Sequence, residues 1–359
     1  MTEAFDPKSL RQWWPKPSKP RPIVIFGAGS IVGDAHLPAY RKAGFPVAGL
    51  YDPDRGKAEA LASAWGIRAF TSPEEALAVD GAIFDLATPP AAHASILRTL
   101  PKGSFALIQK PMGSDLSGAT EILGICRERD IKAAVNFQLR FAPMMLALQD
   151  AVAKGLLGEI VDFDAWLALA TPWGLWPFLK GLPRIEIAMH SIHYLDFIRG
   201  MLGDPQGVHA RTLGHPNHEV AQTRTAAILD YGPRVRCVLS VNHDHDFGRK
   251  FQACEFRICG TRGAAYVKLG VNLDYPCGEP DELWIHPDGG KDWMAVSLEG
   301  TWFPDAFENR MANLQRFAAG EDSELIGSVE DAWHTMALVE AAYESSARPA
   351  TPLAKKPEA

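Results

Sequence analysis

The sequence predicts an α/β protein in which a doubly wound parallel sheet is followed by an α+β domain with an open, mainly antiparallel sheet. From Arg21 onward, short apolar runs alternate with stretches of helical length, which is typical of strand–helix–strand units in a parallel sheet. After residue 138, apolar or alternating runs follow one another across short turns such as YGPR and CGTRG, as in an antiparallel sheet. A chain of 359 residues suits two domains of ordinary size.

The first domain is expected to contain strands that end at a glycine, an aspartate or a proline. These strands are RPIVIF, PVAGLYD, GAIFDL, SFALIQ and IKAAVNF, whose apolar character suits a sheet buried on both faces. The helices between them are expected in GAGSIVGDAHLPAYRKAG after its glycine turn, PDRGKAEALASAWG, AAHASILRTLPKG and DLSGATEILGICRERD.

The second domain is expected to open with a helix in FAPMMLALQDAVAKG. Strands are then predicted in GEIVDFDAWLALA, TAAILDYG, RVRCVLSVNHD, FQACEFRICG, AAYVKLGV, ELWIHP and WMAVSL. The stretch EIAMHSIHYLDFIRG has helical spacing, and two further helices are expected near residues 304–319 and 329–345.

These patterns divide the chain into an arm, two domains and a tail. The arm is irregular because prolines interrupt it, and its Trp13 and Trp14 are expected to pack on the body or on a neighbouring subunit. The tail is expected to be frayed. The predicted segments are 1–20 for the arm, 21–138 for the first domain, 139–346 for a domain of substrate binding and oligomerisation, and 347–359 for the tail.

Composition excludes several classes of function. The formal net charge is −7 and Lys/Arg runs are short, so no nucleic-acid partner is expected. No apolar stretch approaches the roughly 20 residues of a membrane helix, and the polar, proline-rich N-terminus does not resemble a secretory signal. The 5 cysteines are scattered, which favours free thiols in a reducing, cytoplasmic compartment over a zinc ribbon or a disulfide framework.

The stretch IVIFGAGSIVG predicts a dinucleotide-binding turn, so the first domain is expected to be a Rossmann domain. Gly27 permits a tight turn, and Gly29 lets the backbone approach a pyrophosphate. Ser30 and Ile31 then begin a helix, whose free N–H groups favour an anion. Val32 occupies the place of the third glycine of the usual motif, which leaves open a glycine turn without a ligand.

Asp52 ends the second expected strand, at roughly the distance along the chain at which a ribose-binding carboxylate is found. A carboxylate there accepts hydrogen bonds from the ribose hydroxyls and repels a 2′-phosphate. The cofactor predicted is therefore NAD rather than NADP, although the nearby Arg55 weakens this distinction.

The next two strands end in ATPPAAH and IQKPMG. Thr88 and Pro89 suit the start of a helix, and this role alone would explain both residues. His93 could likewise be only a polar residue of that helix. Lys110 follows a parallel strand and is expected to point into the crevice where ligands bind, the alternative being an ordinary surface lysine.

The order of HLPAY, YDPD, TPPAAH, QKP and IHYLD resembles the Gfo/Idh/MocA family of NAD(P)-dependent oxidoreductases over about residues 21–345. The resemblance implies a sugar, inositol or related polyol or keto-sugar as substrate, and a homodimer or homotetramer formed through the second sheet. It implies that Lys110 lies near both the nicotinamide ribose and the reacting hydroxyl, and that His193 transfers the proton. The residues it places at the cofactor are Gly27, Gly29, Ser30, Ile31, Asp52, Thr88, Pro89, His93, Lys110 and Gln138.

Two positions depart from the family pattern. Gln109 replaces the glutamate that usually precedes the lysine, and Met189 replaces an aspartate one helical turn before His193. Because Glu186, His190 and His193 have the spacing of one helical face, Glu186 or His190 is a candidate to replace that aspartate. The same spacing is also compatible with a metal site, although no metal is predicted, and with a purely structural role for either histidine.

The substrate pocket is expected at the domain junction. Arg140 lies just after the last strand of the first domain, and Trp173 and Trp176 offer an apolar wall for a sugar ring, although a packed loop explains them equally well. His190 and His193 complete the predicted lining together with Lys110. Arg184 is a further candidate, whereas HDHDFGRK (243–250) is interpreted as a solvated hairpin end.

The leading hypothesis is a dehydrogenase or reductase that acts on CH–OH groups. The sequence is compatible with two alternatives. One is a glycoside hydrolase that uses bound NAD without net redox change, and the other is a catalytically silent NAD-binding protein.

Overall fold

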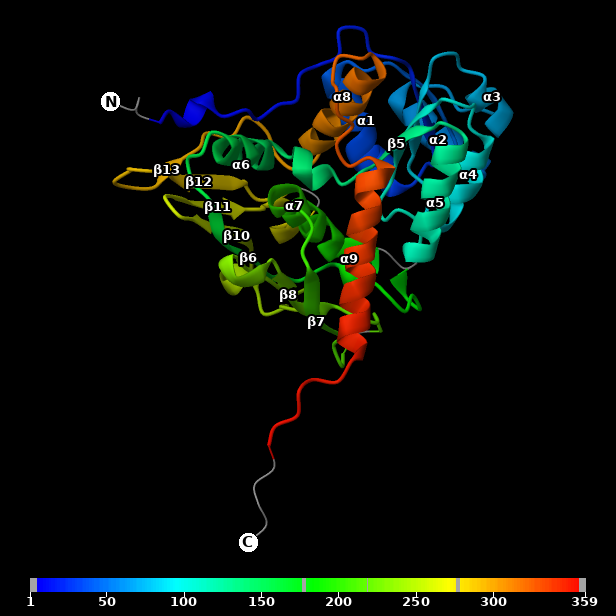
Figure 1. Ribbon diagram of the computed structural model, residues 1–359. Coiled ribbons are helices and arrows are strands. Elements are labelled where there is room, and N and C mark those ends of the chain that lie inside the picture. Colours follow the sequence, from blue (N-terminus) through cyan, green and yellow to red (C-terminus); the bar gives the residue numbers. More distant parts are fainter. Residues whose placement is uncertain (1–4, 176–178, 218, 276–277, 355–359) are drawn as a thin grey trace.

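The computed structural model describes residues 5–175, 179–217, 219–275 and 278–354 (Figure 1). Its first sheet has the order β2-β1-β3-β4-β5, and all of its pairings are parallel. The strands are β1 (Ile23–Phe26), β2 (Val47–Tyr51), β3 (Ile83–Leu86), β4 (Phe105–Ile108) and β5 (Lys132–Val135). The predicted doubly wound sheet is confirmed. The strand order reverses between β1 and β3, so the ligand crevice is expected at the carboxyl ends of these strands.

Short helices cover this sheet, and several begin at a capping carboxylate or hydroxyl. The Asp54 side chain accepts a hydrogen bond from the Lys57 N–H, and Asp115 accepts one from Gly118. The helices are the π-helical turn η2 (Val32–His36), α1 (Leu37–Ala43), α2 (Arg55–Trp65), α3 (Pro73–Leu77), α4 (His93–Thr99) after the 3₁₀ turn η3 (Pro90–Ala92), and α5 (Leu116–Glu128). The short α3 was not expected from the sequence.

The second sheet has the order β13-β12-β11-β10-β6-β9-β8-β7. Its strands are β6 (Ile160–Ala168), β7 (Gly207–Leu213), β8 (Arg224–Asp230), β9 (Arg236–Asn242), β10 (Ala253–Gly260), β11 (Ala264–Lys268), β12 (Glu282–His286) and β13 (Met294–Ala295). β6 pairs in parallel with β9, and the other pairings between its named strands are antiparallel. The prediction of an open, mainly antiparallel sheet is confirmed, although β7 was not identified in the sequence.

One face of the second sheet is covered by helices and the other is open. Phe197 of α7 (Ile192–Leu202) stacks on Phe256 of β10, with ring centroids 5.8 Å apart. On the opposite face Trp166, Ile228 and Trp284 are exposed. Burial alternates along β8 and β9, as expected for strands with one buried side.

The last two helices join the domains. α8 (Asp305–Ala318) lies beside α1, and its Phe307 and Met311 belong to the same core as Ile23 and Ile25 of β1 (Figure 1). α9 (Val329–Ala347) runs from α5 along β7. α6 (Pro143–Ala153) and the 3₁₀ turn η4 (Gln138–Phe141) form the passage from the first sheet to the second.

The N-terminal arm packs on the body. Trp13 Nε1 donates to Glu299 at 3.0 Å, and Trp14 Nε1 donates to Asp322 at 2.7 Å. The Trp14 ring also meets Phe141 edge-on. At the other end of the chain, the described residues after Arg348 are exposed and form neither helix nor strand.

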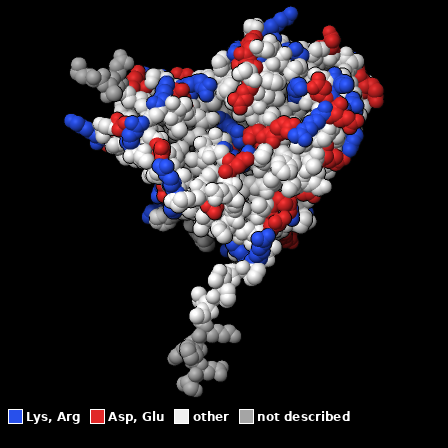
Figure 2. All heavy atoms as spheres, in the orientation of Figure 1, with Lys and Arg blue, Asp and Glu red and all other residues white. Residues whose placement is uncertain are grey.

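The surface shown in Figure 2 intersperses blue Lys and Arg side chains with red Asp and Glu side chains. Across the described part of the chain, no helix has the length and apolar character needed to cross a membrane. Its cysteines, Cys126, Cys237, Cys254 and Cys259, are free thiols.

Candidate active site

The glycine turn after β1 has little space at its first glycine and open space at its second. Gly27 has φ +113°, and a Cβ atom there would lie 2.3 Å from the Ala87 carbonyl oxygen. A Cβ atom at Gly29 would meet no atom of the chain within 4 Å. Helical structure begins at Ser30 and Ile31, beside this space. The turn therefore requires glycine at position 27 for the fold, whereas position 29 borders room for a ligand.

Asp52 lies against the glycine turn. One carboxylate oxygen accepts the Ala28 N–H at 2.8 Å, and the other accepts the Asp54 N–H at 2.8 Å. The carboxylate is thus held at the end of β2, in the place where a ribose would bind. The neighbouring Arg55 forms an exposed ion pair with Glu59 at 2.7 Å.

The end of β3 supplies the next group of residues. His93 is buried, and its Nε2 atom donates to the Thr88 carbonyl oxygen at 3.0 Å. Burial lowers the pKa of His93 to about 4, so the ring is neutral at pH 7. Thr88 Oγ1 and His93 Nδ1 have no hydrogen-bond partner among the described residues. Pro89 is exposed and precedes η3.

Lys110 lies two residues after the end of β4 and reaches across to the second domain. Its Nζ atom donates to the Met189 carbonyl oxygen at 2.6 Å. Burial lowers the pKa of Lys110 to about 8. The Gln109 amide oxygen accepts the Lys110 backbone N–H at 3.2 Å.

The segment before α7 is π-helical from Glu186 to Ser191, named η7. The expectation that Glu186 shares an α-helical face with both histidines is therefore wrong, because π-helical spacing brings Ser191 to Glu186 instead, at 2.5 Å. Thr225 of β8 also donates to the Glu186 carboxylate, and His243 Nε2 lies 3.3 Å from it. Glu186 thus faces the second sheet and anchors η7.

His193 lies in the first turn of α7 and is buried. Its ring meets Trp302 edge-on at 6.0 Å and Phe137 at 6.4 Å. His193 Nδ1 has no hydrogen-bond partner among the described residues. Burial, together with the charge of Lys110, holds the pKa of His193 well below its usual range, so its imidazole is neutral and able to accept a proton.

His190 belongs to an aromatic cluster. Its ring lies 4.7 Å from that of His243 and 5.3 Å from that of Trp173. His243 Nδ1 is 2.7 Å from Thr171 Oγ1. Burial first, and then the charges of His243, Lys110 and His193, hold the pKa of His190 well below its usual range.

The interpretation of 243–250 as a solvated hairpin end is wrong at its start. His243 and Asp244 are both buried, because the segment pairs with the chain after β6 through Ala170 and Asp244. Trp176, which was expected beside Trp173, lies outside the described residues.

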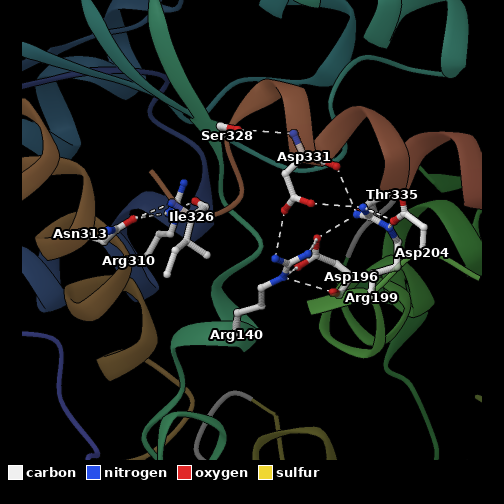
Figure 3. Close-up of polar contacts among 10 residues, drawn as sticks. All are labelled: Arg140, Asp196, Arg199, Asp204, Arg310, Asn313, Ile326, Ser328, Asp331 and Thr335. Carbon is white, nitrogen blue, oxygen red and sulfur yellow. Dashed lines mark hydrogen bonds and ion pairs between the residues drawn. The ribbon is translucent and has the colours of Figure 1, made fainter. Parts of the chain in front are cut away.

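Two predicted arginines lie in ion pairs away from these groups. Arg140 binds Asp196 with both ends of its guanidinium, at 2.5 and 2.8 Å, and its third nitrogen lies 3.0 Å from Asp331 (Figure 3). A cavity of about 770 Å³ adjoins this pair but is not lined by Lys110 or by the histidines. Arg184 pairs with Glu340 at 2.7 Å on the surface. The structure thus assigns a structural environment to Arg140, with its donors already used.

Several polar groups at the domain junction have no partner among the described residues. These groups are Gln138 Oε1, the side-chain amide of Asn136 and the indole N–H of Trp302. The sequence predicted Gln138 as a site residue, but it did not identify Asn136 or Trp302. Asn136 immediately follows β5, and its place at a strand end was the available signal. Trp302 and His243 are far from the other residues in sequence, and no local pattern marks them.

These groups fit a dinucleotide. The glycine turn, the carboxylate of Asp52 and the helix beginning at Ser30 suit a ribose and a pyrophosphate. The buried, unpartnered atoms of Thr88, Asn136 and Gln138 offer hydrogen bonds that water or a ligand must satisfy. Among the described residues, no group of three or more His, Cys, Asp or Glu side chains is arranged to hold a metal ion.

Two protein-family models match this chain. Residues 21–137 match the oxidoreductase family with an NAD-binding Rossmann fold, and residues 145–266 match the GFO/IDH/MocA C-terminal domain. Among curated proteins, D-apiose dehydrogenase of Rhizobium rhizogenes is 25% identical over 324 residues, which are 85% of this chain and 89% of that protein. Inositol 2-dehydrogenase of Rhizobium meliloti is 28% identical over 211 residues, which are 57% of this chain and 58% of that protein.

Solved structures share the whole architecture. An oxidoreductase from Agrobacterium radiobacter, determined with NAD+, L-tartaric acid and magnesium, superposes with a TM-score of 0.77. It is 22% identical, and the match covers 92% of this chain and 97% of that one. This likeness supports the two-domain fold.

Proposed function

This chain belongs to the GFO/IDH/MocA family of NAD-binding oxidoreductases, and we propose that Lys110 and His193 perform its proton chemistry. The protein is an NAD(P)-dependent oxidoreductase that acts on CH–OH groups of a sugar or polyol, as the named dehydrogenases of apiose and inositol among its relatives do. One observation supports the residue assignment: the Lys110 ammonium of the first domain reaches the turn before α7, and its charge acts on the buried, neutral imidazole of His193 in the second domain.

When bound, NAD supplies the nicotinamide carbon that accepts hydride. The residues proposed to hold it are Gly27 and Gly29 at the pyrophosphate and Asp52 at the adenosine ribose. Thr88 and Gln138 are proposed to contact the nicotinamide half, together with Ser30, Ile31, Pro89 and His93 along the same edge of the sheet. Asp52 supports a preference for NAD, because its carboxylate repels a 2′-phosphate.

The oxidation needs a group that removes the hydroxyl proton and a group that stabilises the developing alkoxide. His193 is neutral and can take the proton. Lys110, charged below its pKa of about 8, donates a hydrogen bond to the same oxygen. In the reductive direction His193 returns the proton to the oxygen while Lys110 again stabilises the alkoxide.

Met189 stands where the family pattern has an aspartate, and we propose that Glu186 and His190 replace that aspartate only in part. Glu186 accepts hydrogen bonds from Ser191, Thr225 and His243, so we propose that it positions η7 rather than assisting Lys110. His190, beside Lys110 and Trp173, is proposed to contact the substrate together with Trp173.

The open face of the second sheet supports a homodimer or homotetramer. Trp166, Ile228 and Trp284 are exposed on it, and a second copy would remove these side chains from water. Light scattering of the purified protein tests this assembly. A cytoplasmic location is proposed from the free thiols, which suit a reducing compartment.

The test of the proposed function is nicotinamide absorbance during incubation with NAD or NADP and a panel of sugars, sugar acids and inositols. A substrate-dependent rise with NAD is expected, together with its loss in Lys110→Met and His193→Asn. A protein that binds NAD but reduces none of it with any panel member would contradict the proposal.

A further inference from the structure

A buried aspartate interrupts the apolar strand β3. Asp85 lies in GAIFDL with no exposed surface, and a carboxylate in such a place is costly unless hydrogen bonds compensate for its burial. Its Oδ2 atom accepts the Tyr40 hydroxyl at 2.7 Å and lies 2.7 Å from Nδ1 of His36, and both of these side chains are fully buried too. The other oxygen, Oδ1, has no partner among the described residues, so Tyr40 and His36 supply the compensation.

His36 and Tyr40 belong to the helix that leaves the nucleotide turn. His36 is the last residue of η2, and Tyr40 follows one turn later in α1. Asp85 stands two residues before Ala87, whose carbonyl oxygen lies where a Cβ atom on Gly27 would clash. His36, Tyr40 and Asp85, here called the buried trio, therefore tie the nucleotide helix to the strand against whose end the glycine turn packs.

The nucleotide helix lacks the glycine that usually sets its packing. In the usual motif the third glycine lets the helix lie close to the strands. Val32 occupies that place with its side chain buried, and the helix begins with a π-helical turn, a feature that is frequent at functional sites. A contact other than a glycine must therefore fix this end of the helix, and the buried trio joins helix and strand at this point.

We propose that His36 is a positioning residue for the dinucleotide and that it acts through its hydrogen bond to Asp85. The bond holds η2 against β3, so that the N–H groups at the start of the helix, at Ser30 and Ile31, face the pyrophosphate. Because His36 is fully buried, it acts on the backbone of η2 and not by contact with the cofactor. The inference rests on the proposed NAD site, and it is independent of the roles given to the proton-handling residues.

The test compares two replacements of His36 in the full-length protein. Asparagine keeps an N–H donor near the place of Nδ1, whereas leucine has a similar shape and no donor. Calorimetric titration with NAD and with ADP-ribose should give a Kd at least about tenfold higher in His36→Leu, and His36→Asn should recover most of that loss. KM for NAD should rise in His36→Leu, while KM for the sugar or polyol changes little. His334→Leu removes an exposed pair of His334 Nδ1 with Asp204, 2.9 Å apart, and is the matched control.

Two results would overturn the inference. In one, His36→Asn binds ADP-ribose as weakly as His36→Leu does; in the other, both variants bind it like the parent protein and only unfold at a lower temperature. If His36→Leu does not fold, Tyr40→Phe removes the other hydrogen bond to Asp85 and should raise the Kd for ADP-ribose several-fold, whereas an unchanged Kd would contradict the inference. ADP-ribose carries no nicotinamide, so its binding does not depend on turnover. A failure of the proposed dehydrogenase would therefore appear separately, as absent NADH formation.

Discussion

The Nζ atom of Lys110, two residues after the end of β4, donates to the carbonyl oxygen of Met189, in the π-helical turn before α7, at 2.6 Å. This contact joins the nucleotide-binding sheet to the helix that carries His190 and His193. An ammonium has three donors, so the contact orients Lys110 and leaves donors for a substrate oxygen. The proposed catalytic pair, Lys110 and His193, therefore draws one residue from each domain.

Replacing either proposed catalytic side chain should abolish most turnover. Lys110→Met and His193→Asn each remove one proton-handling group, so kcat should fall by about 10²- to 10⁴-fold. NAD affinity, measured by calorimetry, should change little in His193→Asn. Lys132→Met, at an exposed lysine of β5, is the control. Unchanged kcat in either catalytic variant would show that the assignment is wrong.

The rate of alcohol oxidation should fall as pH rises through about 8. Burial lowers the pKa of Lys110 to about 8, so the ammonium that is proposed to stabilise the alkoxide is lost above that pH. A profile of kcat against pH measures this limb. In Lys110→Arg the charge persists, so the residual activity should lose the alkaline limb. If kcat of Lys110→Arg still falls at the same pH, a group other than Lys110 causes the fall.

The two glycines of the nucleotide turn should respond differently to alanine. Gly27→Ala places a Cβ atom 2.3 Å from the Ala87 carbonyl oxygen at φ +113°, so it should lower the free energy of unfolding by at least about 1–3 kcal/mol. Gly29→Ala meets no atom within 4 Å, so it should fold normally and weaken NAD binding. Urea denaturation and NAD titration separate the two effects. Equal stability of both variants would contradict the argument.

Asp52 should set the preference for NAD. Asp52→Asn removes the charge and keeps the shape, so KM for NAD should rise by about tenfold or more while activity with NADP improves. The ratio of kcat/KM for the two cofactors is the measurement. Asp80→Asn, at an exposed aspartate of the same domain, provides the comparison. An unaltered ratio would mean that other residues select the cofactor.

The Arg140–Asp196 pair should contribute to stability rather than to substrate binding. Asp196→Asn leaves a buried guanidinium short of one carboxylate, so the free energy of unfolding should fall by about 3–5 kcal/mol (Figure 3). The exposed Arg236–Asp162 pair is the control, and Asp162→Asn should cost less than about 1 kcal/mol. The inference fails if Asp196→Asn has the stability of the parent protein and a raised substrate KM.

The sequence by itself determined the layered architecture. Alternating apolar runs and helical stretches predicted both sheets, because burial on one or two faces imposes a period that is visible locally. The ends of β1, β2, β3 and β4 also marked Gly27, Asp52, Thr88 and Lys110, because parallel strands deliver their carboxyl ends to one edge.

Only the tertiary structure decided how the second half of the site is assembled. A π-helical turn carries Glu186 to Thr225 and His243, which no α-helical spacing predicts. His243 and Trp302 come from segments that are distant in sequence, and Arg140 forms a buried ion pair with Asp196 instead of lining the site. These contacts depend on how the two sheets pack across the junction, and packing between distant segments leaves no local pattern in a sequence.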